Sequence, residues 1–226
     1  MSGSRGRIDA EHPLGGEMSD VLRGLIRRFQ LTTLLRYHSA VPLLALFSFV
    51  NGCVSIGVMA LAALATGQPF IFPSLGPTAF LFFYTPTAPA ASPRNALAGH
   101  LIGAAAGWVS LALFGLRDAG PALAVGVDAQ RVGAAALSLG LTSGVMVLTR
   151  TPHPPAGATT LIVSLGILTD LSQIAVLMLA VVLLTVQAFV INRLAGIPYP
   201  LWSPPSQQGA ADGSAGAVRV GPAREG

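Results

Sequence analysis

Two short stretches of the chain combine hydroxyl side chains with glycine and lie beside prolines. Their residues are Ser74, Gly76 and Thr78 in the first stretch, and Gly157, Thr159 and Thr160 in the second. Hydroxyl groups can donate hydrogen bonds to an oxyanion, and glycine lets the backbone approach it closely. These residue types favour a binding site for a small anion. The alternative is that each Ser or Thr only caps the start of a helix.

Three further polar residues lie in or beside apolar runs, and they are Asn51, His100 and His153. His153 could attract an anion when protonated, or hydrogen-bond to a carbonyl when neutral. An ionisable residue inside a membrane span, such as His100, is a functional candidate, although an interhelical hydrogen bond explains it equally well. Asn51 has the same two interpretations. We include all three in the predicted substrate site.

The composition indicates an integral membrane protein. Of the 226 residues, 52% are hydrophobic and 10% are charged, which is too apolar for an ordinary soluble domain. All 13 basic residues are arginine, and a basic balance beside a bilayer requires no nucleic acid. A single cysteine, Cys53, and the absence of metal-binding or catalytic motifs predict no metal, no cofactor and no enzymatic activity.

Four apolar runs are long enough to cross a bilayer as helices, which takes about 20 residues. They cover residues 41–66, 95–116, 131–149 and 171–193. Each run predicts one membrane-spanning helix.

Two other apolar pieces, 68–84 and 150–168, start with proline and glycine. Proline disfavours helix at and before its own position, so Pro69 to Pro77 and Pro152 to Pro155 should not be helical. We expect an extended half followed by a half-helix in each piece, with the helices beginning near Pro77 and Ala158. An extended half plus a half-helix could cross the whole membrane, which makes six crossings in total.

The order of long span, broken span and long span occurs twice. An offset of 81 residues maps Pro154, Gly157 and Thr159 onto Pro73, Gly76 and Thr78, and it matches them in type. A unit with three crossings ends on the opposite side from its start, so the second copy must be inverted. The sequence therefore predicts an all-α polytopic membrane protein with about six segments in two inverted repeats. The half-helix N-termini should face one another near the bilayer midplane and bind an anion.

Arginine placement predicts the orientation. The region before the first span carries Arg23, Arg27, Arg28 and Arg36, which favours a cytoplasmic N-terminus, with the C-terminus on the same side, in a bacterial inner membrane. We expect a tail over residues 1–40 with an amphipathic interfacial helix at 18–36, a transmembrane domain over 41–195 and a disordered tail over 196–226. Charge in the loops fits four helices with two re-entrant hairpins equally well.

Glycines recur every four residues at Gly99, Gly103 and Gly107, and again at Gly140 and Gly144. Such spacing allows helix backbones to approach closely. The partner helix could belong to the same chain or to a second copy in a homodimer.

Three segments, FPSLGPTAFLFF, SPRNALAGHLIGAAAGW and TPHPPAGATTLIVSLG, together resemble the HPP family of integral membrane proteins. The family takes its name from a His-Pro-Pro motif, here His153, Pro154 and Pro155, and the resemblance covers about residues 35 to 195. It implies a compact multi-span protein, often described with four spans. Members in chloroplasts and cyanobacteria are described as nitrite transporters.

The residues and the resemblance together predict a transporter or channel for a small monovalent anion, with nitrite as the first choice. Nitrate, formate or bicarbonate would fit the same site nearly as well. A pore for a small neutral solute and a membrane scaffold without transport activity are the alternatives.

Overall fold

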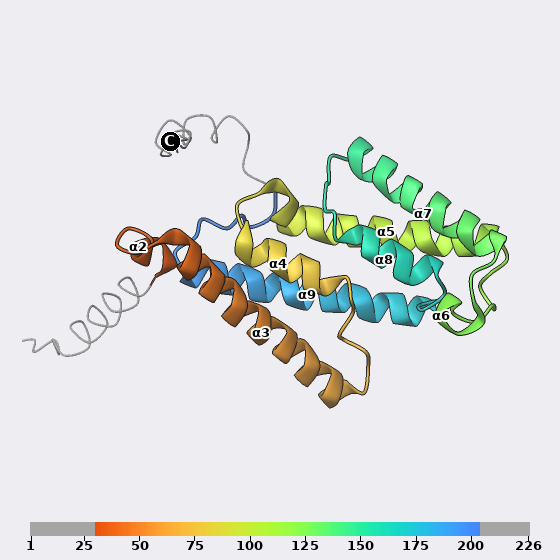
Figure 1. The fold of residues 1–226 in the computed structure, drawn as a ribbon, viewed down its shortest axis with the longest axis horizontal. Helices are drawn as coiled ribbons and strands as arrows, with labels where there is room; N and C mark the ends of the chain where they lie inside the picture. Colours follow the sequence, from red (N-terminus) through yellow and green to blue (C-terminus); the bar gives the residue numbers. More distant parts are fainter. Residues whose placement is uncertain (1–29, 204–226) are drawn as a thin grey trace, which may run out of the picture.

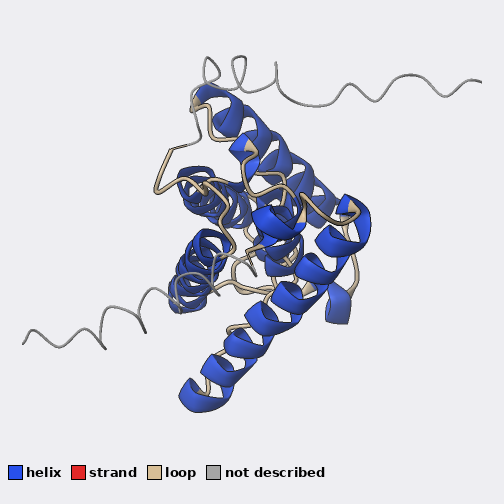
Figure 2. Ribbon diagram, turned by 90° about the vertical axis from the view of Figure 1, so that its left-hand side faces the viewer, coloured by secondary structure: helices blue, strands red, loops and turns tan. Residues whose placement is uncertain are grey.

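The computed structural model describes residues 30–203, and all regular secondary structure in this range is helical, with no β-strand (Figure 2). The four long helices are α3 (Ala40–Thr66), α5 (Pro93–Leu113), α7 (Ala129–Leu148) and α9 (Leu171–Leu194). All four are long and apolar enough to cross a membrane. The four predicted spans are confirmed, with bounds that differ by at most three residues.

Local sequence fixes where the long helices begin and end. The side chains of Ser92 and Asp128 accept hydrogen bonds from backbone amides in the first turns of α5 and α7. Asp170 forms a capping box at the start of α9. At the other end of α3, Gly67 adopts a left-handed conformation with φ 68°, which glycine tolerates without steric strain.

Two short helices, α4 (Leu75–Tyr84) and α8 (Ala156–Ser164), lie between the long ones in the chain, and each follows a non-helical stretch that contains prolines. Both begin two residues earlier than predicted. The sequence predicted a non-helical chain up to Pro77. This was wrong for the last residues of that stretch, because α4 begins at Leu75 and Pro77 lies in its first turn. An amide there has no intrahelical acceptor, so proline removes no helical hydrogen bond.

Six crossings are not confirmed by this structure. With 10 and 9 residues, α4 and α8 are each far shorter than the roughly 20 residues that a helix needs to cross a bilayer. The four long helices are therefore the candidate spans. In Figure 1, α4 and α8 both start near the middle of the bundle and run toward opposite ends of it.

The long helices that follow α4 and α8 are exchanged between the two halves of the chain. Helix α5 packs on α7 and α8, whereas α9 packs on α3 and α4, and α5 and α9 also contact each other (Figure 1). Each half of the bundle is consequently completed by a helix from the other half of the chain.

Helix α4 supplies much of the apolar core. Leu75, Phe82 and Phe83 are almost fully buried and belong to one cluster with Met59 of α3 and Leu184 of α9. Burying a side chain of this size inside a protein contributes about 1.5–3 kcal/mol relative to exposure to water. The aromatic side chains therefore fix α4 between α3 and α9.

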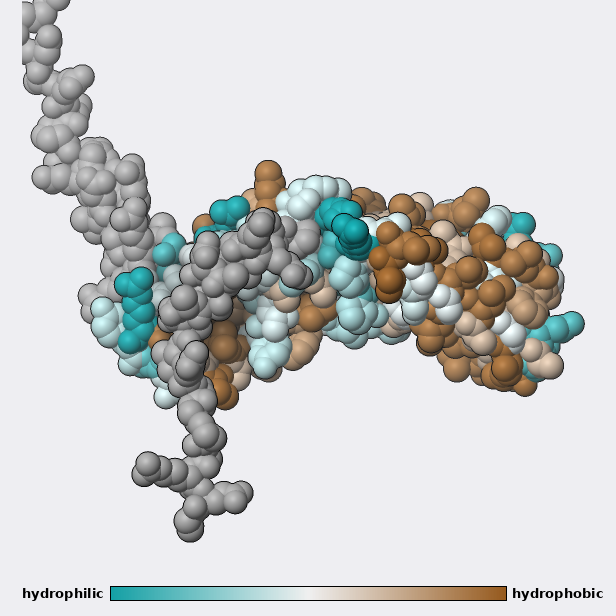
Figure 3. All heavy atoms as spheres, turned by 90° about the horizontal axis from the view of Figure 1, so that it is seen from above, coloured by the Kyte–Doolittle hydropathy of each residue, from teal (hydrophilic) through white to brown (hydrophobic). Residues whose placement is uncertain are grey.

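Large apolar side chains also cover the outside of the bundle, where Figure 3 shows brown residues over much of the right-hand half. Phe49, Leu61 and Leu64 of α3 are more than half exposed. Surfaces of this extent suit lipid and would be unfavourable in water. The protein is an integral membrane protein.

The two ends of the described chain lie together. The Thr32 amide donates to the Ala195 carbonyl at 3.5 Å, just before and just after the four long helices. An even number of crossings places both ends on the same side of the membrane, which agrees with this contact. Of the predicted amphipathic helix at 18–36, residues 30–36 are described and include the short α2 (Leu31–Leu34), whereas residues 18–29 lie outside the described part. Of the predicted tail at 196–226, residues 204–226 lie outside it. The cytoplasmic orientation stays a prediction.

Candidate functional site

One imidazole ring connects the two short helices. His100 of α5 lies within hydrogen-bond distance of Thr78 of α4, with Nε2 to Oγ1 at 2.9 Å, and of Thr159 of α8, with Nδ1 to Oγ1 at 2.7 Å. All three side chains are fully buried. Thr78 and Thr159 are each the fourth residue of their helix, and they are the pair related by the offset of 81 residues. The two equivalent threonines therefore bind opposite nitrogens of the same ring.

The second buried histidine continues this cluster. His153 Nδ1 lies 2.7 Å from the carbonyl oxygen of Ala90, and its Nε2 lies 3.3 Å from Thr78 Oγ1. Its ring centroid is 4.9 Å from that of His100. A carbonyl oxygen can only accept a hydrogen bond, so Nδ1 of His153 must carry a proton. In the neutral ring Nε2 is then an acceptor that faces Thr78.

The first glycine series positions α8 against α5. A Cβ atom built on Gly103 would lie 2.6 Å from the Ala156 carbonyl oxygen, and one on Gly99 would lie 2.7 Å from the Cβ of His153. A Cβ on Gly107 would meet Val163 at 2.7 Å. These glycines bring the His-Pro-Pro segment and α8 into contact with the helix that carries His100.

The second glycine series has a different environment. No atom lies within 4 Å of a Cβ built on Gly140 or Gly144. Both residues line an open groove of about 430 Å³ on α7. The second glycine series is therefore the one available for the predicted homodimer contact, because the first glycine series is already covered by α8 and the segment before it.

The start of α8 uses its own backbone donors. The amides of Ala156, Gly157 and Ala158 donate to the carbonyls of residues 153, 154 and 155 at 3.0, 3.0 and 3.1 Å. These amides are therefore engaged by carbonyls that precede the helix. The positive end of the helix dipole remains, because it arises from the alignment of all peptide units in the helix.

A cavity of about 360 Å³ adjoins this helix start. His153, Gly157 and the flanking prolines Pro152 and Pro154 line one side of it, and the other lining residues, all on α7, are Leu139, Ser143, Met146 and Val147. Two of the predicted site residues, His153 and Gly157, are thereby placed at one cavity. This volume is larger than a three-atom anion needs, so part of its hydration shell could enter with it.

The other predicted site residues on the short helices and beside them form no hydrogen bond with either histidine. Thr160 Oγ1 lies 2.7 Å from Thr142 Oγ1 of α7 and donates to the Ala156 carbonyl at 3.1 Å. Gly76 is exposed near the start of α4. Ser74 contributes its carbonyl oxygen, which accepts from the Thr78 hydroxyl at 2.9 Å, while its own buried hydroxyl has no hydrogen-bond partner among the described residues.

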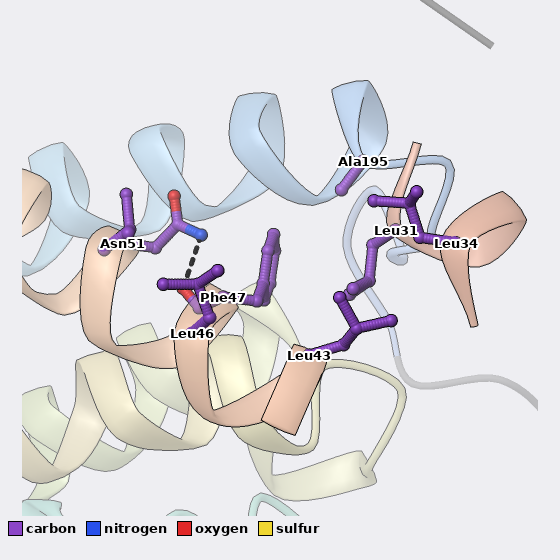
Figure 4. Close-up of a pocket in the computed structure, with 8 residues that line it drawn as sticks. Leu31, Leu34, Leu43, Leu46, Phe47, Asn51 and Ala195 are labelled. Carbon is purple, nitrogen blue, oxygen red and sulfur yellow. Dashed lines mark hydrogen bonds between the residues drawn. The ribbon is translucent and has the colours of Figure 1, made fainter. Parts of the chain in front are cut away.

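Asn51 lies at a different place on the molecule. Its side-chain amide donates to the Phe47 carbonyl in the preceding turn of α3 at 2.7 Å (Figure 4). The surrounding pocket of about 250 Å³ is otherwise apolar and includes Leu31, Leu43 and Ala195. Asn51 is therefore not grouped with the histidines.

Sequence reasoning missed two features around the site. The Ala90 carbonyl that fixes the proton of His153 carries no signal in the sequence. Arg131 was not among the predicted site residues, yet its side chain is buried and donates to the carbonyls of Gly120 at 2.8 Å and Ser164 at 3.4 Å. A cation beside the last residue of α8 stabilises the negative end of that helix. Within residues 30–203, no group of three or more His, Cys, Asp or Glu could hold a metal ion.

Comparison with known proteins places this architecture in a family. A transmembrane protein of Dictyostelium discoideum is 37% identical over 93 residues, which are 41% of this chain and 27% of that protein. The chain thus spans about a quarter of the length of this relative. No solved structure matches the chain. The family profile described as HPP, transmembrane region, matches residues 38–200, which include both short helices and both buried histidines. The protein belongs to the HPP family of integral membrane proteins.

Proposed function

We propose that this protein moves a small monovalent anion across the membrane, with nitrite as the first candidate. The observation that carries the proposal is the cavity of about 360 Å³ at the N-terminal end of α8, lined by His153 and Gly157. An N-terminal helix end carries roughly half a positive charge and attracts anions. A cavity at that position is favourable for a negative solute.

The charge distribution around the cavity supports the same conclusion. Its lining residues include no Asp or Glu, and His153 supplies the one titratable group in the lining. None of the helices from α3 to α9, which include the short α6 (Ala122–Val125), contains an acidic residue. An anion in this part of the protein therefore meets no fixed negative side chain within the described helices.

The two short helices supply the path on either side of the cavity in our proposal. Helices α4 and α8 run toward opposite ends of the bundle from neighbouring starts (Figure 1). If each short helix and its proline-containing lead cross the membrane together, the chain has six segments in two inverted repeats. The exchange of α5 and α9 favours two related repeats, because each half of the chain contributes one long helix to the other half.

Flux measurements test the proposal. Purified protein in liposomes should take up nitrite faster than protein-free liposomes, and a membrane potential that is positive inside should increase the rate. Replacing Gly157 with Leu would place a bulky side chain in the cavity and should reduce uptake, whereas Gly52→Leu on α3, where the surroundings are open, should not. Uptake equal to that of protein-free vesicles would refute the proposal. Competition by nitrate, formate and bicarbonate would rank the substrates.

A scaffold role is the second candidate, and the open groove along Gly140 and Gly144 favours it. Small residues on an exposed helix face allow close approach of another helix. Gly144→Leu should then abolish association with a second copy, as measured by cross-linking in the membrane, while nitrite uptake is unaffected. Loss of the cellular phenotype with Gly144→Leu but not with Gly157→Leu would support the scaffold over the transporter.

A further inference from the structure

We propose that four buried side chains relay a proton to the anion cavity, so that the anion moves together with a proton. The proposed relay consists of Thr159, His100, Thr78 and His153, in that order. It rests on the proposed function, because it names the ion that accompanies the transported anion at the same cavity.

The direction of the relay follows from its last acceptor. The Ala90 carbonyl requires the proton of neutral His153 to be on Nδ1, which leaves Nε2 as an acceptor. Among residues 30–203, the only hydroxyl within reach of Nε2 is that of Thr78, at 3.3 Å. When Thr78 donates there, its oxygen is free to accept from His100 Nε2 at 2.9 Å. His100 Nδ1 is then an acceptor and takes the hydroxyl proton of Thr159 at 2.7 Å. All donors therefore point from Thr159 toward His153.

Thr78 can open or close this relay. Its hydroxyl has one proton and two acceptors, which are the Ser74 carbonyl at 2.9 Å and His153 Nε2 at 3.3 Å. With the proton toward Ser74, the relay is interrupted before His153. Rotation of the hydroxyl toward His153 completes it, and hydroxyl rotation is fast compared with helix movement.

One passage of a proton can be written with every bond balanced. A hydronium ion adds a proton to the Thr159 oxygen as the original hydroxyl proton passes to His100 Nδ1. The Nε2 proton of His100 passes to the Thr78 oxygen, and the Thr78 proton passes to His153 Nε2. Both threonines end as neutral hydroxyls, and His100 ends as the neutral tautomer with its proton on Nδ1. The added charge resides on His153, which is then an imidazolium.

The groups around the relay leave this charge uncompensated until an anion arrives. Within residues 30–203, the titratable or charged group packed against each imidazole is the other imidazole. Helix α4 presents the Thr78 hydroxyl and the Phe82 ring, α8 presents the Thr159 hydroxyl, and the turn η1 (Pro89–Ala91) presents the Ala90 carbonyl. A protonated His153 at the cavity wall would therefore pair with the anion and let a pH gradient drive its uptake, while the anion alone still responds to the membrane potential.

The test separates the two driving forces in liposomes. For the wild-type protein, an acidic exterior at zero membrane potential should accelerate nitrite uptake beyond the leak of nitrous acid into protein-free vesicles. Thr159→Val removes the first hydroxyl and should lower this pH-driven rate by about a hundredfold, the lower end of what a positioned proton donor contributes. Thr159→Ser restores the hydroxyl and should restore the rate.

A matched control corrects for the loss of a buried hydroxyl alone. Thr185 of α9 is buried and donates only to the Val181 carbonyl of its own helix, at 2.7 Å. Thr185→Val should therefore retain the pH-driven rate. Equal pH-driven rates in Thr159→Val and Thr185→Val would overturn the relay. Wild-type uptake that responds to voltage but not to the pH gradient would overturn the relay and leave anion transport standing, whereas no uptake under either force would overturn both.

A second measurement uses the wild-type protein and does not depend on the folding of any variant. Nitrogen-15 NMR of histidine-labelled protein in lipid reports which ring nitrogen carries the proton. The relay requires Nε2–H in His100 and Nδ1–H in His153 at neutral pH, with signals assigned by His100→Gln and His153→Gln. The same tautomer in both rings would overturn it.

Discussion

Replacing Gly103 with alanine should separate α8 from α5. A Cβ atom at this position would lie 2.6 Å from the Ala156 carbonyl oxygen and 2.8 Å from Thr160 Oγ1. Side-chain rotation cannot relieve the first contact, because its partner is a backbone atom. Helix α8 must therefore move away by several tenths of an ångström, and the hydrogen bond between His100 and Thr159 must lengthen with it.

The expected loss of stability follows from two opposing effects. Forcing extra atoms into a packed interface destabilises by about 1–3 kcal/mol. Alanine is a better helix former than glycine by about 1 kcal/mol, which offsets part of the loss. We expect a net decrease of about 0–2 kcal/mol in the free energy of unfolding for Gly103→Ala, which places it about 1–3 kcal/mol below Gly140→Ala. At Gly140, where no atom lies within 4 Å, only the helix-forming gain applies.

Unfolding of the purified protein in mild detergent, followed by circular dichroism during titration with a denaturing detergent, measures both variants. Gly103→Ala should unfold at a lower denaturant fraction than Gly140→Ala, and Gly140→Ala at the same fraction as wild type or a higher one. If Gly103→Ala were as stable as Gly140→Ala, the contact between α5 and α8 would not have the geometry described above.

Three further predictions concern the ends and the middle of the bundle. The Tyr199 hydroxyl donates to the Ala91 carbonyl at 2.6 Å, so Tyr199→Phe should lower the free energy of unfolding by about 1–2 kcal/mol at neutral pH in the same titration. Burial raises the pKa of Tyr199, which means that its contribution is complete below the unfolded value of about 10 and is lost as the pH rises through the folded value. Wild type should lose stability above pH ~10, and a Tyr199→Phe protein that loses it equally would contradict this account. Asn192 donates from α9 to the Phe82 carbonyl at the C-terminal half of α4, at 2.9 Å, and Asn192→Leu should destabilise by about 1–3 kcal/mol because the buried carbonyl is left unpaired. Cys53 lies in the middle of α3 with its side chain exposed on the bundle, so a membrane-impermeant maleimide should label it in detergent-denatured protein but not in intact vesicles.

Hydrophobic length and proline placement were sufficient to predict the four long helices and the two short helices α4 and α8. The four long helices follow from apolar runs, and both short helices follow from prolines that interrupt such runs. Their starts were misplaced by two residues because proline is tolerated in a first helical turn, as at Pro77. The exchange of α5 and α9 was not predictable, because an apolar run does not specify which neighbour covers it.

The sequence predicted which residues belong to the candidate site better than it predicted the contacts among them. The 81-residue offset identified Thr78 and Thr159 as equivalents, and both bind His100 in the structure. Nothing in the sequence indicated that one ring would lie between them, since His100 was assigned no partner. Asn51 was grouped with the site because a polar residue in a span looks alike whether it bonds to its own helix or to a solute.

The connections between the two halves of the bundle set where movement can occur. Helix α5 is held to α8 along Gly99, Gly103 and Gly107, so His100 and Thr159 belong to one packed unit. Helix α4 is held by aromatic packing to α3 and α9 and carries Thr78 as its link to His100. If the halves move relative to one another during transport, the hydrogen bond between Thr78 and His100 must break, because it joins them. We therefore expect Thr78→Val to change the rate of anion uptake under both driving forces, whereas Thr159→Val, within one half, should affect only the pH-driven rate. An equal effect of the two substitutions on voltage-driven uptake would show that the halves do not separate at His100.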